Sequence, residues 1–331
     1  MSERTQAPLY KGPKQSGLEQ RNAQQQRPMQ EQEPTRESAL QPEQTRCLSK
    51  ELEQKYAELR RYLASLGSVV VAFSAGVDST LLLWVAHDVL AQHKTLAVTA
   101  RSCSFPAREL NAAVAFCAEQ GIEHVIIESE ELDIPGFAQN PPDRCYLCKS
   151  GLFSRIWPIA HERGLAHVIE GSNADDTGDY RPGLKAVREQ GVESPLLHAG
   201  LTKDEVRSLA SHLGLKVHDK PSFACLASRF PYGEKITATA LEMVAAAEQY
   251  LLDQGFSQVR VRNHRGLARI ETDASGFALL EGAEVRRQVY AYFKRLGFDY
   301  VALDVLGYRS GSMNETLDSL EVSAPVVDGS A

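Results

Sequence analysis

The chain has 331 residues, of which 43% are hydrophobic and 24% are charged, a composition typical of a globular protein with about two domains. Its formal net charge of −7 excludes a protein that binds polyanions through bulk positive charge, so we expect no nucleic-acid partner. The sequence has neither a signal-peptide stretch nor an apolar run approaching the ~20 residues that span a bilayer. It therefore predicts a soluble, cytoplasmic protein with no membrane partner.

The N-terminal segment is predicted to be a disordered tail. Residues 1–46 contain ten Gln, five Pro and a single aromatic residue, Tyr10. Such a segment cannot bury enough apolar surface to offset the conformational entropy that it would lose on ordering. We therefore expect folded structure to begin near Leu48.

Beyond the tail, the sequence predicts helices that alternate with strands. Leu52, Leu59 and Leu63 recur with helical spacing, which indicates an amphipathic helix. The strands and helices that follow are expected at 69–73, 79–91, 96–99, 107–120, 124–127, 146–163 and 167–170. A capping box at Thr202–Glu205 opens a further helix. This alternation predicts an α/β fold with a doubly wound parallel sheet.

After about Tyr232 the pattern becomes that of a small α+β unit. Its elements are expected as a helix over 238–254, paired strands around Asn263–Gly266, a helix over 283–296 and a strand over 300–305. Three parts should therefore follow the tail. They are a larger α/β domain over 47–232, a small domain for substrate binding or oligomerisation over 233–315, and a flexible C-terminus over 316–331.

An anion-binding loop is predicted where the first strand runs into a helix, at Ser74-Ala75-Gly76-Val77-Asp78-Ser79. Backbone N–H groups at a helix N-terminus point at phosphate oxygens, and the helix dipole favours negative charge there. Gly76 lets the backbone approach closely, and the hydroxyl groups of Ser74 and Ser79 add donors. Asp78 suits such a loop if a cation shares the site, as Mg²⁺ beside a triphosphate would.

This loop resembles the PP-loop of the N-type ATP pyrophosphatases, usually written SGGxDS, and it lacks the Gly-Lys-Ser/Thr ending of a Walker A loop. Ala75 replaces the first glycine, and alanine fits there if its φ is negative. The resemblance implies that ATP is cleaved between its α and β phosphates. The ATP phosphates and Mg²⁺ would be held by Ser74, Gly76, Asp78 and Ser79, with Ala75, Val77 and Ala100 also in the ATP site. The alternative is a serine-rich turn without function.

Three further stretches narrow the substrate. Residues 171–183 follow a strand end, where open α/β sheets bind ligands, and residues 225–233 lie at the expected domain junction. Arg260 and Arg262 alternate on an expected strand, so both side chains point to the same face. A pair of arginines suits a phosphate group.

Together with Arg309–Asn314, these stretches resemble the LarE family over about residues 48–315. LarE enzymes are ATP-dependent sulfur transferases that help to build the nickel-pincer nucleotide cofactor. The resemblance implies that a carboxylate of pyridinium-3,5-biscarboxylic acid mononucleotide is adenylated and that pyrophosphate leaves. Sulfur then displaces AMP and gives a thiocarboxylate.

The same resemblance assigns roles to individual residues. Asp78 and Cys225 are expected to be catalytic. The substrate or its phosphate is expected to contact Asp176, Arg181, Ser228, Arg229, Glu248, Arg260 and Arg262. Glu248 has a second interpretation as a solvated residue of an Ala-rich helix. We also expect a homo-oligomer that hands its product to other proteins of nickel-pincer cofactor biosynthesis.

The cysteines set the expected source of sulfur. Cys145 and Cys148 form a C-x-x-C motif, and Cys225 lies in the junction loop. Some LarE enzymes sacrifice a cysteine of this loop, whereas three-cysteine members hold a [4Fe–4S] cluster. Thiolates are the usual ligands of such clusters, and three of them leave one iron open for an exchangeable sulfide. We favour a cluster on these three cysteines. A sacrificial or persulfide Cys225, and a zinc or redox dithiol site, are the alternatives.

Three other classes of function compete with this interpretation. PP-loop tRNA thiolases can also combine the loop with three cysteines, but the acidic charge of the chain counts against tRNA binding. Ammonia-using ligases of the NAD synthetase type resemble the stretch 173–176 but do not need a C-x-x-C motif. A non-enzymatic nucleotide-binding protein would not need intact loop chemistry at several separate sites.

Overall fold

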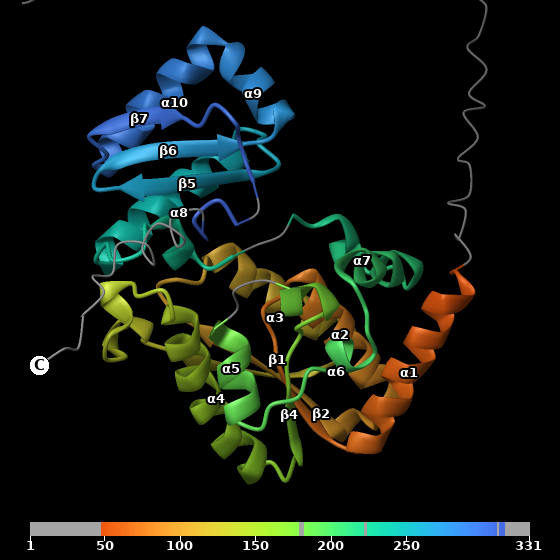
Figure 1. Ribbon diagram of the computed structural model, residues 1–331. Coiled ribbons are helices and arrows are strands. Elements are labelled where there is room, and N and C mark those ends of the chain that lie inside the picture. The colour runs from red at the N-terminus through yellow and green to blue at the C-terminus, as the bar shows by residue number, and fades with distance from the viewer. Residues whose placement is uncertain (1–47, 179–181, 222–223, 310, 315–331) are drawn as a thin grey trace, which may run out of the picture. The chain divides into compact units, whose positions relative to one another are not determined.

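The computed structural model describes residues 48–178, 182–221, 224–309 and 311–314 (Figure 1). The predicted tail over 1–46, the predicted flexible C-terminus over 316–331 and the substrate candidate Arg181 lie outside these residues. Within the described part of the chain, no helix is long and apolar enough to cross a membrane.

The first sheet has four parallel strands in the order β3-β2-β1-β4. These strands are β1 (Val69–Ala72), β2 (Thr95–Arg101), β3 (Glu123–Glu128) and β4 (His167–Ile169). In the register of the sheet, Val70 lies between Leu96 of β2 and Val168 of β4. Parallel neighbours need crossover connections, and an α-helix follows each of β1, β2 and β3. The predicted α/β fold with a parallel sheet is confirmed.

Helices pack against both faces of this sheet (Figure 1). They are α1 (Lys50–Leu66), α2 (Val77–Val89), α3 (Ala107–Gln120), α4 (Arg144–Glu162), α5 (Pro182–Glu189), α6 (Pro195–His198) and α7 (Lys203–His212). Successive residues of a strand point to opposite faces. Val69 and Val71 enter one core with Leu81 of α2. Val70 enters a second core with Ile156 of α4, so the sheet is covered on both sides.

The C-terminal elements form a smaller sheet in the order β5-β6-β7. They are α8 (Ala238–Asp253), β5 (Val259–His264), β6 (Leu267–Thr272), α9 (Ala274–Glu281), α10 (Ala283–Leu296) and β7 (Tyr300–Leu303). β5 and β6 are antiparallel and joined at Arg265 and Gly266, whose φ values of 52° and 92° suit a two-residue type I′ turn. β7 runs parallel to β6. The core of this unit joins Val261 to Phe293 of α10 and also includes Phe137, from a 3-10 turn before α4.

Three helices are absent from the sequence-based expectation: α5, α6 and α9. α5 has eight residues and α6 has four, too few for the helical period to stand out. α9 is capped by Asp273, whose side chain accepts a hydrogen bond from the backbone of Gly276 at 3.0 Å, and it ends at Gly282, where α10 begins. These helices connect predicted elements and leave the order of both sheets unchanged.

Candidate functional site

A cavity of about 550 Å³ lies between the loops that follow the parallel strands and the residues around β5. Its lining carries seven basic side chains, those of Arg144, Lys149, Lys203, Arg229, Arg260, Arg262 and Arg309. It carries three carboxylates, those of Asp78, Asp175 and Asp176. This surplus of positive charge suits an anionic ligand, although the whole chain has a net charge of −7.

The cavity brings together residues that lie far apart in the sequence. The predicted site residues in its lining are Asp78, Cys145, Asp176, Ser228, Arg229, Arg260 and Arg262. The other predicted residues within the described ranges lie outside the lining: Ser74, Ala75, Gly76, Val77, Ser79, Ala100, Cys148, Cys225 and Glu248. The lining therefore includes Asp78 of the phosphate loop and the arginines of β5, whereas the other predicted residues of the loop lie outside it.

The phosphate loop connects β1 to α2, and Gly76 is the residue that caps this helix. Among the described residues, no side chain caps the first backbone N–H groups of α2, so these groups are available to an anion. Ser74 donates a backbone hydrogen bond to Ser79 Oγ at 3.3 Å, and the two hydroxyl oxygens lie 3.1 Å apart. The two serines thus close the loop on itself.

Ala75 takes a backbone conformation that the sequence analysis does not foresee. Its φ is +55°, in the left-handed region that favours glycine, so the condition under which alanine would fit, a negative φ, is not met. The residue is buried, with 2% of its surface exposed, in the core beside α2. Lys220 Nζ donates a hydrogen bond to its carbonyl oxygen at 3.0 Å. A contact from so distant a part of the chain cannot be read from a six-residue motif.

Asp78, the second residue of α2, faces the cavity with two partners. Asn173 Nδ2 donates to Oδ1 at 2.9 Å, and Lys203 Nζ forms an ion pair with Oδ2. Lys203 is the first residue of α7, and a capping box of Thr202 and Glu205 fixes that end of the helix. A lysine therefore contacts the carboxylate that is expected to share its site with Mg²⁺.

Arg229 and Glu248 form a buried ion pair with two hydrogen bonds. Arg229 Nε lies 2.7 Å from Oε1 and Nη2 lies 3.0 Å from Oε2, and both residues are 0% exposed. The interpretation of Glu248 as a solvated residue is therefore wrong. Burial raises the pKa of this carboxyl group, but the charge and hydrogen bonds of Arg229 outweigh that effect and leave the pKa lowered.

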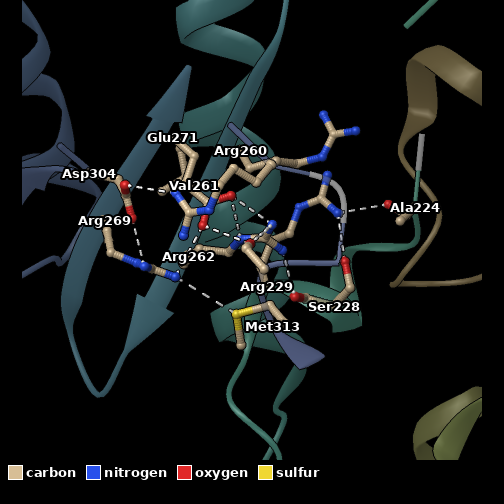
Figure 2. A network of polar contacts seen from close by, with 12 residues as sticks. Ala224, Ser228, Arg229, Arg260, Val261, Arg262, Arg269, Glu271, Asp304 and Met313 are labelled. Atoms are coloured by element: carbon tan, nitrogen blue, oxygen red, sulfur yellow. Dashed lines mark hydrogen bonds and ion pairs between the residues drawn. The ribbon is translucent and has the colours of Figure 1, made fainter. Parts of the chain in front are cut away.

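The remaining nitrogen of Arg229, Nη1, holds the loop that comes before α8. As Figure 2 shows, Arg229 Nη1 donates to the backbone oxygen of Ala224 at 2.9 Å and to Ser228 Oγ at 2.7 Å. The loop that carries Cys225 and Ser228 is thereby tied to α8 through Glu248.

Arg262 links β5 to its surroundings. Its Nη2 donates to Glu271 Oε2 of β6 at 2.7 Å, and its Nη1 donates to the backbone oxygen of Ser228 at 2.9 Å (Figure 2). Ser312 Oγ accepts a further bond from Nη2 at 3.2 Å. This arginine therefore joins three separate segments at the cavity wall.

Arg260 lies in a crowd of positive charge. Its guanidinium sits over the ring of Tyr308, 5.1 Å from the ring centre. Burial first, and then the charges of Arg229 and Arg262, lower the pKa of Arg260 to about 10, with Glu248 opposing. Because like charges raise the free energy of the protonated form, a bound anion at this wall would be stabilising.

Cys145, Cys148 and Cys225 lie close enough to influence one another's ionisation. Cys145 is exposed on α4, whereas Cys148 and Cys225 are half-buried. Burial raises the pKa of the Cys148 thiol well above its ordinary value, and the nearby charges of Glu131 and Cys225 raise it further. Burial also raises the pKa of Cys225; Arg144 opposes this effect and Cys145 adds to it. The three thiols therefore share one neighbourhood.

The three thiols are candidate ligands for a cluster. Within the described ranges, no group of three or more His, Cys, Asp or Glu side chains is arranged to hold one metal ion. A [4Fe–4S] cluster is larger than one ion and is usually held by thiolates. Cys145, Cys148 and Cys225 supply the type of donor that such a cluster needs.

Several polar residues near the cavity carry no motif and are absent from the sequence-based expectation. Lys149 Nζ donates to Glu170 Oε2 at 2.9 Å, just beyond β4. Glu131 accepts hydrogen bonds from Cys148 Sγ at 3.3 Å and from Ser104 Oγ. Of these residues, only Lys149 could have been predicted from the sequence, because it directly follows the C-x-x-C motif.

Comparison with known proteins identifies relatives along most of the chain, although no family model matches it. An uncharacterised protein of Synechocystis is 43% identical over 266 residues, which cover 80% of this chain and 99% of that protein. The pyridinium-3,5-bisthiocarboxylic acid mononucleotide synthase of Lactiplantibacillus plantarum is 40% identical over 274 residues, covering 82% of this chain and 98% of the synthase.

A more distant similarity covers about half of another class of enzyme. The tRNA-specific 2-thiouridylase MnmA of Rickettsia felis is 29% identical over 192 residues, which cover 46% of this chain and 52% of MnmA. The likeness to the synthase is higher in identity and extends over nearly the whole of that enzyme.

Proposed function

We propose, because this chain belongs to the LarE family of PP-loop sulfur transferases, that it transfers sulfur in the biosynthesis of the nickel-pincer nucleotide. Its substrate would be pyridinium-3,5-biscarboxylic acid mononucleotide, and ATP would activate a carboxylate of that molecule. The observation that carries the proposal is the 40% identity to the synthase over 98% of its length. The basic cavity, which places Asp78 and the arginines of β5 around one space, supports it.

The first step is adenylation. A carboxylate oxygen of the substrate attacks the α-phosphorus of ATP, the bond to the β-phosphate oxygen breaks, and pyrophosphate leaves with that electron pair. The backbone N–H groups at the start of α2 would hold ATP phosphates, and Asp78 would bind the Mg²⁺ that accompanies them. Lys203, which contacts Asp78, would stabilise the charge that develops on pyrophosphate.

The mononucleotide is placed by the wall formed by β5. Arg260 and Arg262 would bind its phosphate or a carboxylate, and Ser228 would add a hydroxyl donor. Arg229 and Glu248 lie behind this wall and would keep the loop of Ser228 in position. The substrate's reacting carboxylate is thereby oriented towards the phosphate loop.

The second step replaces the adenylate with sulfur. A sulfur nucleophile attacks the acyl carbon, AMP leaves with the electrons of its bond to that carbon, and a thiocarboxylate remains. Cys145, Cys148 and Cys225 would hold a [4Fe–4S] cluster, which would supply an iron site for an exchangeable sulfide. Cys225 as the direct sulfur donor is the alternative: its thiolate would displace AMP to give a thioester, and loss of the Cα proton would then break the Cβ–S bond, leaving the thiocarboxylate and a dehydroalanine at position 225.

We propose that the chain acts in the cytoplasm, which suits its free cysteines. It would work as a homo-oligomer and pass its thiocarboxylate to a later protein of the same biosynthesis. A tRNA 2-thiolation activity is less well supported, because the similarity to MnmA covers 46% of this chain. An NAD synthetase-like ligase has no support among the relatives named above.

Replacement of Asp78 tests the adenylation step. Asp78→Asn removes the charge expected to bind Mg²⁺, so pyrophosphate release that depends on the mononucleotide should fall roughly 100-fold or more. Asp88→Asn is the matched control, because Asp88 lies on the same helix in an exposed ion pair with Arg60. Unchanged pyrophosphate release by Asp78→Asn would contradict the assignment of the loop, and a tRNA gel shift would test the alternative.

A further inference from the structure

The phosphate loop contains one residue whose backbone conformation is unfavourable by itself. Ala75 has a φ of +55°, whereas its glycine neighbour, Gly76, has an ordinary φ of −77°. A residue with a Cβ keeps a left-handed conformation only where the surrounding structure holds it there. The glycine thus stands beside the position that needs its conformational freedom, and some other feature must fix Ala75.

That feature is a partly buried ion pair next to the loop. Lys220 Nζ donates to the carbonyl oxygen of Ala75 at 3.0 Å and to Glu109 Oε2 at 2.6 Å. Glu109 belongs to α3 and is 4% exposed, so its charge depends on a partner within the protein. If Ala75 relaxed to a negative φ, its peptide groups would rotate and the bond to Lys220 would be strained or lost. The lysine therefore holds the carbonyl at the point where the loop would otherwise relax.

The lysine is itself anchored. Arg207 of α7 donates from Nη2 to the backbone oxygen of Lys220 at 2.8 Å and from Nη1 to that of His218 at 2.6 Å. The first residue of the same helix, Lys203, contacts Asp78. α7 thus supports the loop at two points, Asp78 directly and Ala75 through Lys220.

We propose that Lys220 and Glu109 are positioning residues that hold the phosphate loop in its anion-binding shape by fixing Ala75 in the left-handed conformation. Lys220 Nζ donates to the carbonyl oxygen of Ala75 and to the carboxylate of Glu109, so both residues act on the shape of the loop. We call the contacts of Lys220 with Ala75 and Glu109 the clamp. With the clamp in place, the N–H groups at the start of α2 would point to where ATP phosphates would lie. The inference rests on the proposed function, because it takes ATP as the ligand of the loop.

The test first removes the lysine of the clamp and then, in the same variant, replaces Ala75 with glycine, which needs no support at a positive φ. Lys220→Met should weaken binding of Mg·ATP about tenfold, the equivalent of one hydrogen bond to a charged group. Adding Ala75→Gly should restore affinity to within about twofold of the wild-type protein, because glycine adopts a positive φ without a Cβ penalty. Isothermal titration calorimetry of Mg·ATP gives the dissociation constants for the full chain.

Lys216→Met is the matched control, since Lys216 is exposed in the short turn just before Lys220. The affinity of this variant for Mg·ATP should equal that of the wild-type protein. If Lys220→Met does not fold, Glu109→Gln replaces it and should show a smaller loss that Ala75→Gly also reverses. A general loss of stability would lower the unfolding midpoint without being corrected by a glycine in the loop.

Two results would overturn the clamp. Wild-type affinity in Lys220→Met would show that Ala75 needs no support, and a weakened affinity that Ala75→Gly leaves uncorrected would show that Lys220 acts elsewhere. Wild-type protein that binds no Mg·ATP would instead overturn the proposed function, and with it the role of the clamp.

Discussion

The phosphate loop would offer a ligand the backbone N–H groups at the start of α2, whereas the arginine cluster (Arg229, Arg260 and Arg262) would offer the side chains of Arg260 and Arg262, with Arg229 buried behind them. The loop depends on its backbone shape, and one bond from Lys220 fixes the unusual residue. The cluster depends on counter-charges, because Glu248 and Glu271 pair with two of its buried arginines.

The difference teaches how each of these two regions tolerates substitution. A main-chain site keeps its donors when a side chain changes, provided that the φ and ψ angles are kept. A side-chain site loses both charge and hydrogen bonds, and it leaves the partner charge buried alone. Three predictions test this contrast, and the first separates both regions from the sulfur step.

The largest expected effect lies in the sulfur step, which neither region performs. Cys225→Ala should abolish thiocarboxylate formation while pyrophosphate release continues, because the loop and the arginine cluster remain intact. Mass spectrometry of the product and a pyrophosphate assay measure the two steps. Cys103→Ala is the control, since Cys103 packs against the same core as Cys225.

Full sulfur transfer by Cys225→Ala would remove this cysteine from the reaction. If Cys225→Ala does lose sulfur transfer, metal analysis of the wild-type protein purified without oxygen separates the two sulfur sources. About four irons per chain, lost in Cys145→Ala, would support the cluster. An iron-free protein that resists reconstitution would leave Cys225 as the direct donor.

The next effect is on stability and concerns the arginine cluster alone. Glu248→Ala leaves Arg229 buried without its carboxylate, so the free energy of unfolding should fall by about 3–5 kcal/mol. Glu242→Ala, at an exposed position of the same helix, should change it by less than about 0.5 kcal/mol. Chemical denaturation measures both values, and equal effects of the two variants would show that the buried pair is not a special source of stability.

The smallest expected effect tests whether the phosphate loop and the arginine cluster bind different ligands. Arg260→Met removes a charge expected to bind the mononucleotide, so the KM for that substrate should rise roughly 10- to 100-fold. The KM for ATP should stay within about twofold, because the phosphate loop keeps its shape. Arg295→Met, at an exposed position of α10, is the control. An equal rise of both KM values would show that the two regions do not bind separate ligands.

Sequence reasoning predicts what is encoded locally. The parallel sheet follows from buried strands that alternate with helices, and the phosphate loop follows from six consecutive residues. Arg260 and Arg262 are predicted as a pair because residues two positions apart on a strand point to the same face. Arg262 meets Glu271 only 9 residues later, across a hairpin that the sequence also indicates.

The rest of the site depends on contacts between distant segments. Lys203 lies 125 residues from Asp78, and Lys220 lies 145 residues from Ala75. A motif carries no information about such partners, so neither the positive φ of Ala75 nor the place of the two lysines at the loop is predicted. The alternative interpretation of Glu248 as a solvated residue fails for a similar reason, since an Ala-rich helix does not reveal which face meets Arg229.

The ion pair between Lys203 and Asp78 also bears on the order in which ligands bind. A carboxylate that already has a cationic neighbour attracts a free divalent ion weakly, because the two positive charges repel each other. If Mg²⁺ came with a triphosphate, the phosphates would provide a new partner for the lysine, and Asp78 would be free to bind the metal. We therefore expect nucleotide and metal to enter together, with the lysine serving as a counter-ion until they arrive.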